Sequence, residues 1–299
     1  MRLDASHRWV RWMPWLFVLI WSTGFVVARF AMPHAGPMSF LSVRFALSVL
    51  CFVVWVLLVR AAWPREPRHF AHLAVSGLLM HAGYLGGVWS AVKLGIGAGT
   101  VSLLVGLQPV LTALWLASTA PRGRTRVLGR EWLGLVLGLV GLALVLGGKF
   151  GIGEVTPVNL SLATLALLSI TAGTLYQKRF VAPCDVRTAN CVQLLAALVV
   201  CLPFALLESE PMRWNEQLLG ALAWSVLVLT LGGSSLLYLL IQRGAATQVT
   251  SLLYLVPPCT ALMAWLLFGE AFSATMLLGL LVTVAGVALV VKATSTPPQ

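Results

Sequence analysis

The sequence predicts an all-α integral membrane protein that crosses the bilayer ten times. Of its 299 residues, 59% are hydrophobic and only 10% are charged. Soluble domains carry charge on roughly a quarter of their residues, so this chain has too few polar side chains to cover a water-facing surface. Apolar runs of about 20 residues, the length that spans a bilayer, recur along the chain. The apolar helix faces are therefore expected to contact the lipid bilayer.

Ten predicted spans follow one another, separated by Pro, Gly and clusters of charge, which start or end helices. The first five spans are expected at 13–31, 37–60, 70–92, 98–118 and 128–147. The second five are expected at 155–177, 187–207, 216–242, 246–268 and 273–292. The first run lacks a small-residue cleavage site, so it is interpreted as a permanent helix and not as a signal peptide.

The basic residues predict the orientation. Cytoplasmic loops of membrane proteins carry an excess of Lys and Arg. With both termini in the cytoplasm, most of the 20 Lys and Arg fall on the cytoplasmic side. The exceptions are Arg29, Arg44, Lys93, Lys149 and Arg213. The net charge of +11 therefore belongs to short loops, and no nucleic-acid partner is expected.

Three pairs of similar segments indicate an internal repeat. RFAMP at 29–33 is similar to RFVAP at 179–183. SLL followed by QP within 102–109 is similar to SLL followed by PP within 251–258. Gly134 and Gly141 correspond to Gly279 and Gly286. Their order and similar offsets predict two halves, 13–147 and 155–292. Because each half has five spans, the two enter the membrane in opposite directions. Such inverted repeats are typical of secondary transporters that work by alternating access.

Four segments of the chain resemble the drug/metabolite transporter superfamily, specifically its EamA-type permeases. The segments are WSTGF at 21–25, the stretch from Pro33 to Phe45, GLQP at 106–109 and LFGE at 267–270. The resemblance covers about 13–292, in two copies. It implies ten helices around a central cavity, both termini cytoplasmic, and export of small metabolites such as amino acids. This agrees with a multi-pass protein of the bacterial inner (plasma) membrane.

One departure from the family pattern concerns Glu270. The Gly269-Glu270 pair follows the fourth span of the second half, whereas Ala117-Ser118 and a basic loop stand in the first half. A symmetric role for the pair is therefore in doubt, and a structural role for Glu270 at a helix end is favoured.

His81 is the candidate for proton coupling. All nine acidic residues lie at span ends or in loops, so no carboxylate is available in mid-membrane, where ionisable groups usually mark function. Imidazole titrates near neutral pH, and His81 lies near the middle of its span. Helical spacing places Gly77, Tyr84 and Val88 on its face, which suits a cavity wall. The alternative is a neutral His81 bonded to a neighbouring helix.

Arg44 is the second ionisable candidate, one to two turns inside the outer end of its span. Its planar guanidinium suits the carboxylate of a substrate. The alternatives are structural: the side chain extends to the membrane surface or bonds backbone carbonyls.

Prolines predict breaks in two spans at matching repeat positions. These positions are Gln108-Pro109 and Pro257-Pro258. Proline frees a backbone carbonyl, and such groups are tolerated at mid-depth where they face protein or water. The breaks therefore predict the binding region, with Gln108 in it; the alternative is a packing kink. Further expected binding residues are Trp21, Ser22, Phe25, Tyr176, Ser235, Tyr238 and Tyr254.

Other classes of protein fit less well. The sequence has no G-x-S-x-G, no H-E-x-x-H and no pair of mid-span carboxylates, so an intramembrane enzyme is the weaker alternative, beside a receptor-like membrane protein. No P-loop is present, which argues against ATP-driven transport. The five cysteines lack metal-ligand spacing, and no metal or cofactor is expected. The glycines of spans 5 and 10 indicate packing within the chain, or else a homodimer surface.

Overall fold

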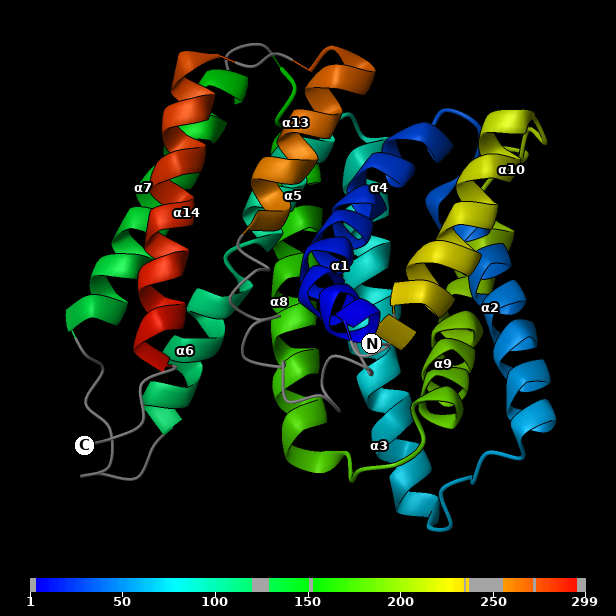
Figure 1. The fold of residues 1–299 in the computed structure, drawn as a ribbon. Helices are drawn as coiled ribbons and strands as arrows, with labels where there is room; N and C mark the ends of the chain where they lie inside the picture. The colour runs from blue at the N-terminus through cyan, green and yellow to red at the C-terminus, as the bar shows by residue number, and fades with distance from the viewer. Residues whose placement is uncertain are drawn as a thin grey trace, which may run out of the picture. The chain divides into compact units, whose positions relative to one another are not determined.

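The computed structural model describes residues 4–119, 129–150, 153–233, 235–236, 255–270 and 273–294. Every regular element in these ranges is a helix, and the elements form ten helical rods (Figure 1). The predicted all-α class and helix number are confirmed. In chain order, the first elements are α1 (Asp4–Ala31), α2 (Pro37–Val59), α3 (Pro67–Gly77), η1 (Leu78–Gly83), α4 (Tyr84–Lys93), α5 (Ala98–Val105), α6 (Gln108–Thr119) and α7 (Gly129–Phe150). The others are α8 (Pro157–Phe180), α9 (Val186–Leu207), α10 (Glu216–Ala223), η2 (Trp224–Gly232), α13 (Val256–Phe268) and α14 (Ala274–Thr294).

The chain packs as two compact units, and each is described by itself. Unit 1 comprises Met1–Thr23, Gly97–Val155 and Leu236–Gln299. Unit 2 comprises Gly24–Ile96 and Thr156–Ser235. Each unit therefore contains segments of both predicted repeats, whose boundaries at 13–147 and 155–292 stay a prediction from the sequence.

Four helical segments within the described residues are long and apolar enough to cross a membrane: α2, Ala98–Trp115 of the α5–α6 rod, α8 and α9. The outer faces of α2 and α9 expose large apolar side chains, among them Leu57, Leu58 and Leu206. Exposed apolar surface of this extent is unfavourable in water and favourable in lipid. Shorter apolar segments lie in α1, α7, α10–η2, α13 and α14.

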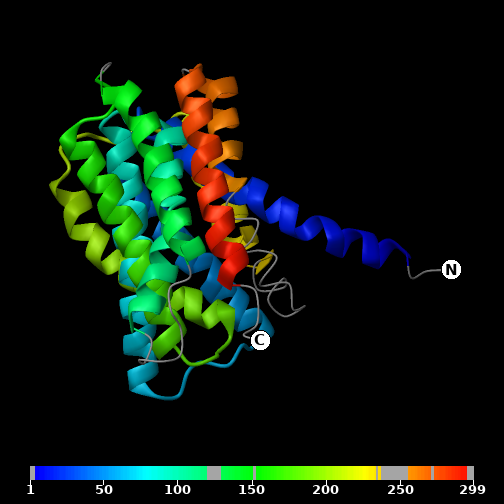
Figure 2. The same cartoon turned by 90° about the vertical axis from the view of Figure 1, so that its left-hand side faces the viewer.

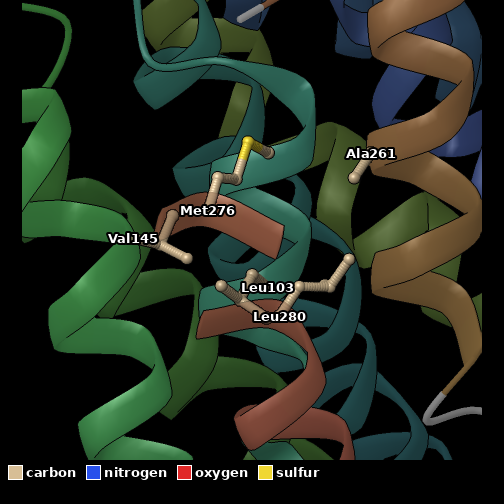
Figure 3. Packing of buried hydrophobic residues seen from close by; sticks show 5 residues of the cluster. All are labelled: Leu103, Val145, Ala261, Met276 and Leu280. Carbon is tan, nitrogen blue, oxygen red and sulfur yellow. The ribbon is translucent and has the colours of Figure 1, made fainter. Parts of the chain in front are cut away.

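The core of unit 1 joins four helices. Leu103 of α5, Val145 of α7, Ala261 of α13, and Met276 and Leu280 of α14 form one buried cluster (Figure 3). Figures 1 and 2 both show α14, in red, alongside α7.

Glycines allow α7 and α14 to pack backbone against backbone. A Cβ atom added at Gly279 would lie 2.5 Å from the carbonyl oxygen of Gly141, and one added at Gly286 would lie 2.6 Å from that of Gly134. Small residues permit this close approach of helices in membranes. The glycine pairs that mark the sequence repeat therefore pack on each other within the chain.

We expect Gly141→Ala to destabilise unit 1. Its new Cβ would collide with the backbone of Gly279 and Thr283, and such overpacking costs about 1–3 kcal/mol. Gly147→Ala, in the same helix, is the control because a Cβ there meets nothing within 4 Å. Thermal unfolding in detergent should show a lower Tm for Gly141→Ala alone; equal Tm values would contradict the packing argument.

The third span of each half contains a π-helical turn in place of the continuous α-helix expected from the sequence. η1 interrupts span 3 and η2 interrupts span 8. The repeat offset of about 149 residues carries the end of η1, Gly83, onto the end of η2, Gly232. Glycine at or beside these ends weakens the α-helical preference. Wide turns of this kind are rare and often occur at functional sites.

The predicted break in span 4 is present. α5 ends at Val105 and α6 begins at Gln108. A Cβ added at Gly106 would lie 2.7 Å from Cγ of Pro257, so the break packs against the first turn of α13. The segment that precedes α13, 237–254, lies outside the described residues.

Glu270 has the structural role at a helix end that the sequence favours, and the helix is α5. Its carboxylate accepts hydrogen bonds from the backbone N–H of Ala98 (2.9 Å) and Gly99 (3.4 Å). Glu154 accepts from the N–H of Gly97 (2.9 Å) and pairs with Lys149 (2.8 Å). Two carboxylates thus satisfy the free amides and the partial positive charge at the start of α5.

Glu270→Gln should lower the stability of the protein by about 1 kcal/mol, because the amide loses the charge that the helix start favours. Glu66→Gln is a matched control: Glu66 precedes α3 and makes no side-chain hydrogen bond to its amides. Thermal unfolding at low salt measures both variants. A Tm for Glu270→Gln at or above that of Glu66→Gln would contradict the capping role.

Candidate functional site

The interior of unit 2 contains a polar group of side chains around Arg44. α2, which carries Arg44, packs against α4 and η2. η1, which carries His81, packs against α3, α4, α8 and α9. The two π-helical turns therefore both border the region around Arg44: Thr230 of η2 bonds Arg44, and His81 of η1 contacts the neighbouring Phe45.

The start of α2 is fixed by Glu208, which follows α9. Its carboxylate accepts hydrogen bonds from the N–H of Met38 (2.9 Å) and Ser39 (2.8 Å). A side chain at Gly36 would collide with this carboxylate. The carboxylate thus anchors α2 and sets the depth of Arg44, which lies about two turns further along the helix.

Arg44 is buried, with 7% of its surface exposed. Its Nη2 donates to Oγ1 of Thr230 (3.2 Å), and its guanidinium carbon lies 6.0 Å from the ring centroid of Trp89. Its Nε is buried without a hydrogen-bond partner. The salt bridges within the described residues are Lys93–Glu210, Lys149–Glu154 and Arg187–Asp185, so Arg44 has no carboxylate partner there. Its charge is therefore held by neutral groups.

His81 and Tyr84 lie close to Arg44. Tyr84 is buried on α4, which packs against the helix of Arg44, α2. The ring of His81 meets Phe45, the residue that follows Arg44 in α2, edge to face at 6.2 Å between centroids. The structure thus brings together three residues that the sequence analysis selected: Arg44, His81 and Tyr84.

Three neutral polar residues extend this group, and sequence reasoning did not select them. Ser76 donates to Oε1 of Gln177 (2.9 Å). Gln193 donates through Nε2 to Ser76 (3.2 Å) and to Gln177 (3.3 Å). The only sequence signal is an amide or hydroxyl within an apolar span. Buried amides need partners, and these three satisfy one another across α3, α8 and α9.

The beginning of α9, which carries Gln193, is fixed by a local ion pair. Asp185 accepts hydrogen bonds from the backbone N–H of Arg187 (2.9 Å) and from its guanidinium (2.9 and 2.6 Å). The Arg187 side chain holds the pKa of the Asp185 carboxyl below its usual value. The guanidinium also lies 5.7 Å from the ring centroid of Trp55 on α2, so it joins the two helices.

Tyr176 lies near the start of α3. Its hydroxyl is 2.9 Å from Nδ1 of His72, and both rings contact Phe180. Phe25 is buried in unit 2, and the hydroxyl of Ser235 donates to the carbonyl of Leu231 (2.6 Å). These contacts do not involve Arg44.

Other predicted residues belong to unit 1. Ser22 is buried; its hydroxyl donates to the carbonyl of Val18 (2.7 Å), and its own carbonyl accepts from Thr260 (3.2 Å). Trp21 contacts Phe17 at 5.3 Å between ring centroids. Gln108, half-buried, begins α6. Tyr238 and Tyr254 lie outside the described residues.

Within the described ranges, no group of three or more His, Cys, Asp or Glu side chains could hold a metal ion. The side chains around Arg44 are suited to binding a ligand. They provide a buried cation with an unused hydrogen-bond donor, hydroxyl groups and aromatic side chains.

Comparisons with known proteins bear on the family and the fold of the chain. A family model described as the EamA-like transporter family matches 9–147 and 159–292. The chain is 26% identical to the uncharacterized transporter YvbV of Bacillus subtilis, over 91% of this chain and 88% of that protein. It is 27% identical to the uncharacterized inner membrane transporter YedA of Escherichia coli K12, over 91% and 87%. The double match confirms the internal repeat and the resemblance seen in the sequence.

Two further comparisons concern function and fold. A probable amino-acid metabolite efflux pump of Salmonella typhimurium is 23% identical over 91% of both chains. A solved structure titled "Crystal structure of protein" superposes with a TM-score of 0.65 at 18% identity, covering 96% of this chain and 98% of that one. That structure supports the fold.

Proposed function

The chain belongs to the EamA-like transporter family, and we propose that it exports small carboxylate-bearing metabolites, such as amino acids, by alternating access. It is a multi-pass membrane transporter. The name of the Salmonella relative, a probable amino-acid metabolite efflux pump, supports the direction and the substrate class. The observation that carries the proposal is the buried Arg44, which has no carboxylate partner among the residues that the structure describes.

A buried charge is costly unless a partner balances it. Within the described part of the chain, Arg44 has Thr230 as its hydrogen-bond acceptor and the face of Trp89 as its π-partner. Both are neutral, and Nε carries an unused hydrogen. A carboxylate is the small anion whose two oxygens match the guanidinium edge. Because the site is shielded from water, such a pair is stronger there than at a surface.

Aromatic side chains around Arg44 suit an amphipathic ligand. Trp89 stacks on Phe40 with ring centroids 4.4 Å apart and is 1% exposed, so it is a rigid support for the guanidinium. Tyr84 and His81 add a hydroxyl and an imidazole. Apolar walls with a few placed polar groups are typical of small-molecule sites.

His81 is proposed as the group that couples transport to a proton gradient. It is half-buried in η1 and its ring contacts Phe45, the residue that follows Arg44, so its charge and the occupancy of the anion site would affect each other. We further propose a location in the bacterial inner membrane with both termini cytoplasmic. The binding roles of Trp21, Ser22 and Gln108 stay predictions from the sequence.

Arg44→Gln should weaken transport of amino acids selectively. In proteoliposomes, we expect KM for a labelled amino acid to rise by about tenfold or more, since a lost charge-assisted pair is worth at least about 1.4 kcal/mol. The matching amine, which lacks the carboxylate, should change less than about twofold. Arg44→Lys should be intermediate, because it keeps the charge and loses the planar fork.

Arg213→Gln serves as the control, because this arginine is exposed and its hydrogen bonds to His34 and Asn215 are made by its backbone. Equal loss of the amino acid and the amine in Arg44→Gln would show that Arg44 is structural, and the proposed substrate class would then be wrong.

His81→Ala should abolish the dependence of transport on a pH gradient while counterflow exchange at equal pH continues, because exchange needs no net proton movement. His34→Ala is the control, as His34 follows the end of α1 and its side chain bonds Asn215 and Gln217. If gradient-driven transport survives intact in His81→Ala, His81 is not the coupling group.

A further inference from the structure

We infer that Thr230 is a positioning residue for the anion site, and that the π-helical turn η2 directs its hydroxyl towards Arg44. The inference rests on the proposed role of Arg44 and adds a second residue to that site. Thr230 is as buried as Arg44, with 7% of its surface exposed.

The direction of the Thr230 hydroxyl is fixed by two hydrogen bonds. Oγ1 donates to the carbonyl oxygen of Ser225 (2.8 Å) and accepts from Nη2 of Arg44 (3.2 Å). A hydroxyl has one hydrogen to donate and two lone pairs. Because Ser225 takes the hydrogen, only the lone pairs are available to the guanidinium.

The bond to Ser225 reaches five residues back, which distinguishes Thr230 from the threonines of α8. The hydroxyls of Thr164, Thr171 and Thr174 bond carbonyls four residues back. The backbone of η2 is π-helical, and its wider turn places the carbonyl of Ser225 where an ordinary α-helix would offer that of Val226. The π-turn therefore sets the orientation of Oγ1 on the side where η2 packs against α2.

A neutral hydrogen-bond acceptor such as Thr230 suits an arginine that is proposed to bind an anion. A carboxylate at position 230 would neutralise Arg44 and compete with the substrate. Threonine fixes one donor and leaves the positive charge and Nε available. An arginine side chain has about 2 kcal/mol of rotamer entropy to lose, so holding it in place before the substrate arrives favours binding.

Thr230→Val tests the inference in proteoliposomes, since valine keeps the shape and removes the hydroxyl. We expect KM for the amino acid to rise about three- to tenfold, the effect of losing one hydrogen bond of ordinary strength. The maximal rate and the KM for the matching amine should each change less than about twofold. Thr230→Ser, which restores the hydroxyl, should return KM to within about twofold of the wild type.

Two comparisons separate positioning from general damage. Thr171→Val is the matched control, because Thr171 is equally buried and its hydroxyl bonds a carbonyl of its own helix. In an Arg44→Gln background, Thr230→Val should add nothing, because its effect passes through Arg44. A full additional loss in the double variant, equal losses for amino acid and amine, or a Thr230→Ser variant as impaired as Thr230→Val would each overturn the inference.

The two proposals fail in distinguishable ways. If Arg44→Gln shows no carboxylate-selective loss, the proposed substrate class is wrong and the positioning role falls with it. If Arg44→Gln shows that loss and Thr230→Val matches the wild type, the substrate class stands and the positioning role alone is wrong.

Discussion

In the hydrocarbon core of a membrane, every backbone polar group must be bonded within the protein, and this constraint explains most irregular features of the chain. Helices satisfy the requirement along their length but leave free amides at each start. Glu208 at α2 and Glu154 with Glu270 at α5 supply acceptors for such amides from distant segments. The break between α5 and α6 is shielded by Pro257 of α13. Irregular backbone thus occurs where another part of the same unit covers it.

The same constraint makes the π-helical turns informative. A wide turn weakens regular bonding, so it persists only where its surroundings support it. η1 is packed against α3, α4, α8 and α9, and η2 against α2 and α10. Gly77, directly before η1, leaves no room for a side chain beside the backbone of Gln193, and Gly83 leaves little beside Ser169. Packing by glycine and placement of polar side chains are therefore linked in unit 2.

The sequence predicts the architecture because composition and repeat are strong signals. Span boundaries at Pro37, Pro157 and Val186 fall within a few residues of the expected positions. Arg44 and His81 are recognisable because ionisable residues inside apolar runs are rare. Thr230 and Gln193 are not, because single neutral polar residues are common in spans. The only sequence signal of η2 is the glycine at its end: Trp224–Gly232 is otherwise an almost uniformly apolar run, and its turn type depends on tertiary packing.

Arg44 shows why a lone charge can be maintained in such an interior. A permanent carboxylate partner would lower the cost of burying it but would also occupy the binding edge. Neutral contacts from Thr230 and Trp89 offset part of the free-energy cost of burying the charge and orient the guanidinium. In the proposed function, a bound anion would offset the rest of that cost. In the proposed function, binding of a carboxylate would gain the energy of completing an ion pair with Arg44. Because Thr230 lies on η2 and His81 on η1, the proposed ion pair would be bordered by both π-helical turns, where spans 3 and 8 depart from α-helical geometry.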